Sequence, residues 1–379
     1  MKKLAFFVTI VFLIAGCKKN NDTTTTKQPT YTVPTTYSFP SFSDTNSLKL
    51  LAMADQIGAM INTANVKGGK AVSTQVLTSL FNNTGGYFVD SALRLNSSGL
   101  RLADYVSAAQ KTDLLNYFDS VGLYSQSTTT ASAGVAGVSP SSASPNKLYL
   151  LSPNGVFYSQ VVKKTMQGMT GYAIGNLYLA DSINTSSDTN VLKHYWDAAF
   201  GLFGVPVNFP TVVTGLRYWG SYSNQVNAGF HANTSIMNAF LIGRAAISNN
   251  DLTTMKTQAN ILIRSFDTLN AAAIVQEMHE TNTNVEAGDA VAAYGTLSES
   301  LGFVRDLIYN TSSTRVITPA QITQLLALYD ASNPNNPNLY NFLGVSAGLT
   351  VAQIEQKTNA IAQLIGQIYG FSNTQLPLL

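Results

Sequence analysis

The spacing of apolar residues along this chain is helical almost everywhere beyond the first forty positions. Segments that begin at Leu48 and at Leu114 both repeat with a period near 3.6, whereas runs of alternating β-branched residues are scarce. From Thr350 onward the apolar residues that fall on one helical face are Ile354, Ile361, Leu364, Ile365 and Ile368. The pattern predicts an all-α protein of about ten helices, built as bundles and needing no sheet.

Three helix starts are explicit in the sequence. Thr318 to Gln321 and Thr350 to Gln353 both have the Thr-x-x-Gln spacing of a capping box, in which side chain and backbone satisfy each other's free groups. Pro319 stands at the first helical position of the earlier one. Asp251 is a third expected cap.

Glycine recurs within one predicted helix, at Gly168, Gly171 and Gly175. Each glycine costs about 1 kcal/mol relative to alanine in an exposed helix interior. Such glycines are reasonable where a second helix approaches closely. The alternative is that this region is a loop.

The N-terminus has the three parts of a signal peptide. Lys2 and Lys3 precede a short apolar stretch that ends in small residues, and about 20 apolar residues would be needed to span a bilayer. The last four, Ile14-Ala15-Gly16-Cys17, resemble a bacterial lipobox. We therefore expect residues 1–16 to be removed and Cys17 to be lipidated. The alternative is an ordinary signal peptide whose cleavage site lies near a cysteine.

The next segment, residues 17–43, is rich in threonine and proline without apolar periodicity, and is expected to be a flexible, disordered tether. Residues 44–379 then form a single all-helical domain. Within it, the low-complexity stretch 125–146 is expected to be a long surface loop. Because Cys17 is the only cysteine, the domain has neither a disulfide nor a thiolate metal site.

Composition narrows the class of protein without naming a reaction. Only 11% of the residues are charged, against about 25% in average soluble domains, and the formal net charge is +2. This leaves no basic surface for nucleic acid. Together with the lipobox, the polar but weakly charged composition favours a lipoprotein of the cell envelope, anchored in the outer membrane and facing either side of it.

The most aromatic stretch, residues 190–204, contains the first candidate site. His194 and Asp197 are three residues apart and hence neighbours on a helix, with Trp196 between them. An imidazole and a carboxylate so placed are candidate ligands of a metal ion. Alternatively, they form a buried polar pair within an aromatic core.

Further candidates for a binding site lie in two other segments. Arg217 and Arg244 occur among aromatic residues, where arginine often stacks for structural reasons. His279 and Glu299 belong to the stretch 277–307, which contains four of the five glutamates in the chain. These carboxylates either line a polar cavity or form solvated helix faces.

Several catalytic motifs are absent from the sequence. His279-Glu280 is followed by Thr283 where a zinc-protease helix needs histidine. Residues 344–348 match the GxSxG elbow, yet no histidine follows them to complete a triad. Neither a phosphate-binding loop nor a GxGxxG motif occurs. We therefore expect no catalytic residues.

Three blocks of sequence carry a family resemblance. The first is His194-Tyr195-Trp196-Asp197 with the following residues to Gly204, and the others are residues 240–247 and 297–303. They resemble an uncharacterised family of Gram-negative envelope lipoproteins with an HYWDEAFGYFG-type signature, over about residues 36–370. This family is in turn distantly similar to the imelysins.

The imelysin resemblance implies an all-helical fold of two packed bundle halves. Imelysins were named as metallopeptidases, although many relatives resemble components of iron uptake or binding. The imelysin GxHxxE motif is missing here, and Ala198 and Leu202 replace the glutamate and tyrosine of the closer signature. Peptidase activity is therefore less expected than in imelysins.

These observations lead to one expected function and two alternatives. We expect a non-catalytic binding protein, related to metal or iron uptake, that holds a small ligand or an envelope protein. The cofactor is unassigned, with a metal ion at His194 and Asp197 as the candidate. The first alternative is a divergent metal-dependent peptidase, and the second is a lipoprotein that scaffolds a complex.

Overall fold

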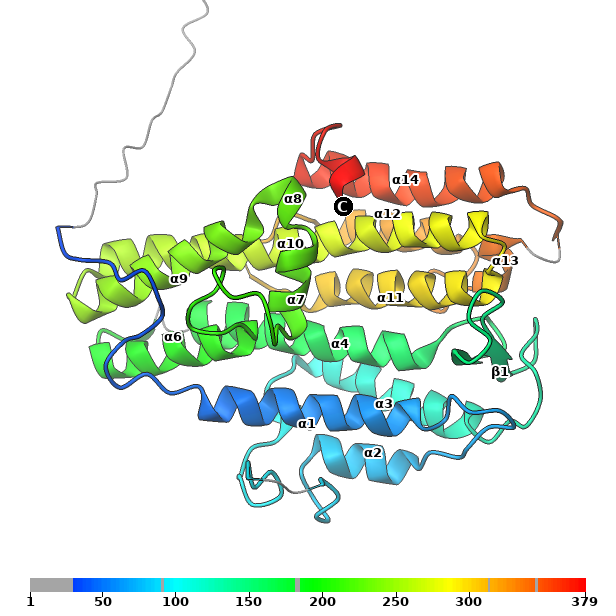
Figure 1. Cartoon of the computed structure of the whole chain (residues 1–379), viewed down its shortest axis with the longest axis horizontal. Helices are drawn as coiled ribbons and strands as arrows, with labels where there is room; N and C mark the ends of the chain where they lie inside the picture. The colour runs from blue at the N-terminus through cyan, green and yellow to red at the C-terminus, as the bar shows by residue number, and fades with distance from the viewer. Residues whose placement is uncertain (1–29, 90–91, 181–184, 313, 345–346) are drawn as a thin grey trace, which may run out of the picture.

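The structure is a computed structural model that describes residues 30–89, 92–180, 185–312, 314–344 and 347–379. It confirms the all-α class (Figure 1). The predicted signal peptide and Cys17 lie outside the described residues. Within the described ranges, no helix is both long enough and apolar enough to cross a membrane.

The α-helices are α1 (Thr45–Asn62), α2 (Thr74–Phe81), α3 (Ala108–Tyr124), α4 (Tyr158–Tyr172), α6 (Thr189–Phe203), α7 (Tyr218–Gln225), α8 (Asn227–Phe230), α9 (Ala232–Ser248), α10 (Leu252–Glu286), α11 (Ala290–Tyr309), α12 (Pro319–Tyr329), α13 (Leu339–Leu343) and α14 (Val351–Tyr369).

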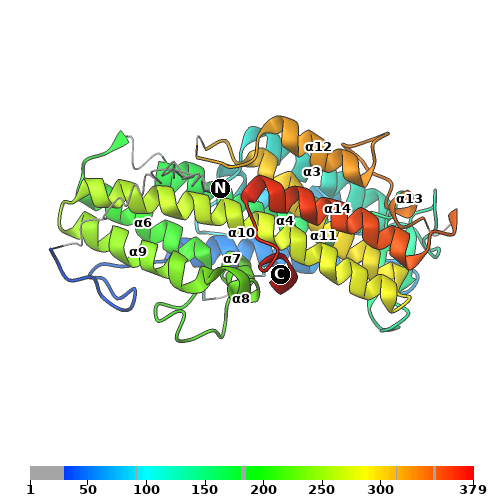
Figure 2. The same ribbon diagram turned by 90° about the horizontal axis from the view of Figure 1, so that it is seen from above.

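The longest helix, α10, organises the bundle. It packs against α9 at one end of the molecule and against α11 and α14 at the other (Figure 2). Helix α4 lies against α11, and α1 lies against α4 on the side away from α10 (Figure 1). Buried apolar side chains form one contiguous cluster from Tyr37 to Phe371. Among the described residues, no separate core marks off either of the two expected bundle halves.

The predicted helix starts are confirmed. Thr318 and Thr350 each accept a hydrogen bond from the backbone of the third helical residue, and the glutamine there bonds back to the threonine. Asp251 caps α10 through the backbone N–H of Thr254, and Asp289 caps α11 in the same way. Each cap satisfies backbone N–H groups that have no partner within the helix.

The glycines at 168, 171 and 175 do lie in helical structure, so the loop alternative is wrong. Gly168 and Gly171 belong to α4, which continues directly into a π-helical segment, η2 (Ala173–Ala180), that contains Gly175. A Cβ atom on Gly168 would overlap the carboxylate of Asp306, and one on Gly171 would lie 3.0 Å from the indole nitrogen of Trp219. The first two glycines therefore permit close approach of neighbouring elements.

The stretch 125–146 is more ordered than a simple surface loop. It contains strand β1 (Gly137–Pro140), which pairs antiparallel with β2 (Leu148–Leu151). Val138 and Leu150 face each other in this register and are buried. The expectation that no sheet forms is therefore wrong for this small hairpin, which packs its apolar side chains onto the helical core.

Residues 30–43 pack against the domain, in contrast to the expected tether. Tyr37 is fully buried, and its backbone N–H donates to the carbonyl of Val207 at 2.8 Å. The Tyr37 ring stacks on Phe200 of α6 with 3.7 Å between ring centroids. The sequence pattern gave no sign of this because an extended segment that is held by a few aromatic anchors has no regular apolar period.

Candidate functional site

The two candidate metal ligands on α6 lie in different environments. Asp197 is buried, whereas His194 is exposed, and no hydrogen bond joins them in the described structure. Because a helix turns about 100° per residue, side chains three positions apart differ in direction by about 60°. Asp197 therefore points into the core while His194 points to solvent, and the expected buried His194–Asp197 pair does not form.

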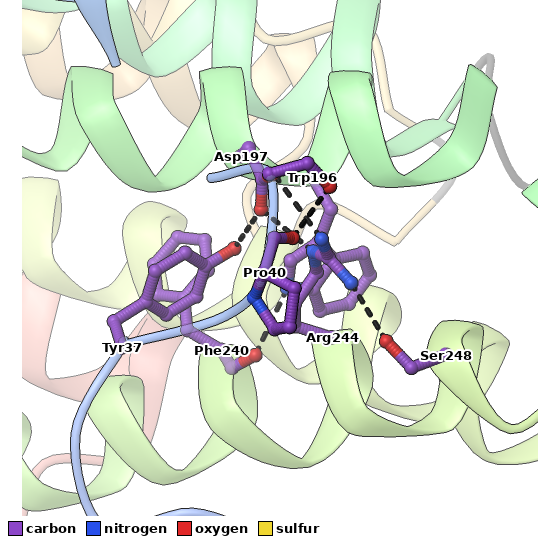
Figure 3. A network of polar contacts seen from close by, with 8 residues as sticks. Tyr37, Pro40, Trp196, Asp197, Phe240, Arg244 and Ser248 are labelled. Atoms are coloured by element: carbon purple, nitrogen blue, oxygen red, sulfur yellow. Dashed lines mark hydrogen bonds and ion pairs between the residues drawn. The ribbon is translucent and has the colours of Figure 1, made fainter. Parts of the chain in front are cut away.

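Asp197 instead forms a buried ion pair with Arg244 of α9. The Arg244 Nε atom donates to Asp197 Oδ1 at 2.7 Å, and Nη2 donates to Oδ2 at 3.4 Å (Figure 3). The hydroxyl of Tyr37 donates to the same Oδ1 at 2.8 Å. Burial and the neighbouring Asp197 carboxylate raise the pKa of Tyr37 well above its ordinary value, so this phenol stays protonated and remains a donor.

The surrounding contacts complete this network. Trp196 donates from its indole nitrogen to the carbonyl of Phe240 at 2.9 Å, and Arg244 Nη1 donates to Ser248 Oγ at 2.8 Å. The guanidinium carbon of Arg244 lies 5.0 Å from the ring centroid of Phe39. Trp196 and Arg244, both predicted as binding residues, thus link α6, α9 and the N-terminal segment. We interpret this network as structural.

A cleft of about 370 Å³ lies between α1 and α4, and one predicted residue, Arg217, stands at its edge. We call it the α1–α4 cleft. Its polar lining residues are Asp55, Asn62, Lys163, Lys164, Gln167 and Tyr218. Gly58 leaves room for the Lys163 side chain. Arg217 of the original set does not line the cleft but forms an ion pair with Asp55 at its edge.

The start of α7 positions the edge of the α1–α4 cleft. Tyr218 has a left-handed backbone conformation, with φ of 48°, which is uncommon for a residue other than glycine. Its hydroxyl donates to Asp55 Oδ1 at 2.9 Å, and burial raises its pKa well above the ordinary value. The backbone N–H of Arg217 donates to the carbonyl of Gly204 at 2.9 Å, which holds the turn in place.

Lys163 is the exposed cation of the α1–α4 cleft. No ion pair or hydrogen bond is formed by its ammonium group within the described ranges, whereas Asp55 pairs with Arg217. Partial desolvation, and then repulsion from Lys164, lower the pKa of Lys163. Gln167 adds a terminal amide whose nitrogen is buried and has no hydrogen-bond partner.

Lys164 points away from Lys163 into a buried polar network, which we call the Lys164 network. Its ammonium lies 2.8 Å from Glu299 of α11 and 2.7 Å from the hydroxyl of Tyr222 of α7. Tyr222 in turn donates to Glu277 of α10 at 3.0 Å. Burial, and then the charge of Glu299, raise the pKa of Glu277 well above its usual value.

Of the predicted residues in the third segment, Glu299 thus belongs to the Lys164 network and His279 does not. His279 lies two positions beyond Glu277 on α10 and is half-buried. Sequence reasoning missed Lys163, Lys164 and Glu277 as a group. The available signal was the presence of two adjacent lysines inside an amphipathic helix of a chain with few charges.

The chemistry available at this site is recognition of charge. No group of three or more His, Cys, Asp or Glu side chains is placed to hold a metal ion within the part of the chain that the structure describes. In the α1–α4 cleft, Arg217 neutralises Asp55, and Glu299 neutralises Lys164. The charge of Lys163 remains unpaired, which suits an anionic group.

A family model for a domain of unknown function, DUF4856, matches residues 96–372. This match confirms the prediction that the chain belongs to an uncharacterised family. No curated protein and no solved structure gives a significant match. The matched range includes Lys163, the Lys164 network and Arg217, while Asp55 on α1 precedes it.

Proposed function

We propose that this chain, which belongs to the family defined by the domain of unknown function DUF4856, is a non-catalytic binding protein of the outer membrane. Its ligand is a small molecule with a carboxylate or phosphate group, held in the α1–α4 cleft. The observation that carries the proposal is the unpaired ammonium of Lys163 in a cleft whose other charges are compensated. An unpaired cation beside desolvated walls attracts an anion more strongly than one on an open surface.

Two further features support the α1–α4 cleft as the binding site. The terminal amide of Gln167 lines it, and rotation of that amide by a half turn would present a donor to a bound anion. The left-handed backbone of Tyr218 costs conformational energy at the edge of the cleft. Strained residues of this kind concentrate at functional sites.

The envelope location is part of the proposal and depends on the sequence. The lipobox-like Ile14-Ala15-Gly16-Cys17 supports lipidation of Cys17, and several acyl chains would hold the domain firmly at a membrane. The imelysin likeness, with its metal-dependent peptidase activity, and the scaffolding alternative stay predictions from sequence. A role in iron uptake is one context for such a binding protein, since many iron carriers bear carboxylate groups.

Isothermal titration of the domain with citrate, inorganic phosphate and neutral glycerol tests the proposal. We expect citrate or phosphate, but not glycerol, to bind at low ionic strength and to weaken as salt rises. Lys163→Met should raise the dissociation constant at least about tenfold, since a charged hydrogen bond contributes about 1.5–3 kcal/mol.

The matched control is Lys256→Met, which removes an exposed lysine from α10 at a distance from the α1–α4 cleft. This variant should bind like the wild type. If neither anion binds, or if both lysine variants lose binding equally, the α1–α4 cleft is not the anion site.

A further inference from the structure

The carboxylate of Asp306 on α11 is buried against the backbone of Gly168 on α4. Its residue is 5% exposed, and neither oxygen accepts a hydrogen bond of normal geometry from the described residues. Natural proteins leave few buried acceptors unsatisfied, because an unpaired polar group in a low dielectric costs free energy. A buried charge without a partner costs still more.

Asp306 lines a small cavity between α4, α10 and α11. The cavity measures about 30 Å³ and lies apart from the α1–α4 cleft. This volume suits a single ion or water molecule and excludes an organic ligand. Gly168 and Gly171 form its wall on α4, and the absence of a side chain at Gly168 is what allows the Asp306 carboxylate to approach the helix.

A second acceptor without a partner lines the same cavity. Asn270 of α10 is 6% exposed, and its carbonyl oxygen Oδ1 has no hydrogen-bond partner among the described residues. The other carboxylate of the cavity, Asp267, is already satisfied by the backbone N–H of Val316 and by the amide of Asn310. Asp306 and Asn270, whose side-chain oxygens accept no hydrogen bond of normal geometry within the described ranges, therefore line one small cavity.

The neighbouring cation does not satisfy these oxygens. Lys164 is one turn before Gly168 on α4, and its ammonium is committed to Glu299 and Tyr222. Burial raises the pKa of Asp306 well above its usual value, against smaller opposing effects from Lys164 and from the nearby backbone of Gly168. The cost of burying the negative charge of Asp306 can therefore be removed in two ways, by a proton on the carboxylate or by a cation beside it.

We propose that the cavity bordered by Asp306 and Asn270 binds a monovalent metal cation, sodium or potassium. Hard cations prefer oxygen ligands, and both residues supply them. Of the two carboxylates that line the cavity, Asp267 already accepts hydrogen bonds from Val316 and Asn310 and has the positive charge of Arg315 nearby, so the charge left without a partner is the −1 of Asp306, which a monovalent ion cancels. A divalent ion would leave an uncompensated positive charge in the interior, and calcium sites usually contain several carboxylates.

The test compares thermal unfolding of the domain in sodium, potassium and choline chloride at equal concentration and at neutral pH. Choline is too large for the cavity, so ionic strength is matched while the candidate ion is removed. We expect the melting temperature to be at least about 3 °C higher in sodium or potassium chloride, because a ligand that binds only the folded state stabilises it.

Two variants assign any response to this cavity. Asp306→Asn keeps the shape of the side chain and should abolish the difference between the salts, and Asn270→Ala should reduce it. The matched control is Asp113→Asn, which removes a carboxylate that accepts from Tyr309 outside the cavity and should leave the difference intact. Equal melting temperatures of the wild type in all three salts would overturn the proposal and favour a protonated Asp306. A difference that persists in Asp306→Asn would overturn it as well.

Discussion

The buried Asp197–Arg244 pair gives the sharpest test of the fold. Arg244→Met removes the guanidinium and leaves the Asp197 carboxylate, 4% exposed, with only the Tyr37 hydroxyl as a donor. Breaking one half of a buried ion pair costs about 3–5 kcal/mol. Because the 2.8 Å bond from Tyr37 still compensates part of the charge, we expect a loss of about 3 kcal/mol in the free energy of unfolding.

The double variant Asp197→Leu with Arg244→Met distinguishes a lost charge from lost packing. It removes the unpaired carboxylate and fills the space with apolar side chains of similar size. In the double variant the Tyr37 hydroxyl is left buried without an acceptor, which should lower the free energy of unfolding by about 1–3 kcal/mol. The double variant should therefore be no less stable than Arg244→Met alone, even though it changes more atoms.

Urea unfolding at neutral pH, followed by circular dichroism, measures the stability of both variants. A double variant clearly less stable than the single one would refute the reasoning, because it would show that packing around Arg244 outweighs its charge.

Three further predictions concern other parts of the bundle. Glu277→Gln should make the free energy of unfolding less dependent on pH. Burial raises the pKa of Glu277, so the folded protein keeps a proton that the unfolded chain releases. The stability of the wild type should therefore fall as the pH rises above about 4.5, the ordinary pKa of a glutamate. Unfolding curves from pH 4 to 8 measure this, and parallel profiles for the two proteins would contradict it. Gly168→Ala should cost about 1–3 kcal/mol in urea unfolding, because the added methyl overlaps the Asp306 carboxylate, and an unchanged midpoint would show that α4 and α11 are not in close contact. Thr350→Ala should cost about 1 kcal/mol by removing one half of the capping box with Gln353, whereas Thr350→Ser should retain most of the stability.

The helical elements could be predicted because their signals are local. A capping box such as the one at Thr350 is complete within four residues, and the apolar face of α14 within nineteen. The strand pairing of residues 137–140 was missed because four residues are too few to show a period. Burial of Tyr37 was missed for a related reason, since its partner Asp197 lies 160 residues away.

The candidate site could be predicted only in part. The sequence drew attention to Asp197, Arg217 and Arg244 because they are charged residues among aromatic ones. It drew attention to Glu299 because four of the five glutamates fall in residues 277–307. It could not assign their partners. Whether an arginine pairs with a buried aspartate or borders a cleft depends on which helix faces it.

By itself, the sequence determined the helical class and the helix caps, which depend on residues close together in the chain, and membership of an uncharacterised family, which depends on blocks of local sequence. Only the tertiary structure decided that Asp197 pairs with Arg244 and that Lys163 remains unpaired in a cleft. It also decided that Asp306 and Asn270 line the same small cavity. The reason is physical: the energy of a charge depends on its burial and on the nearest opposite charge, and both are set by helices distant in sequence.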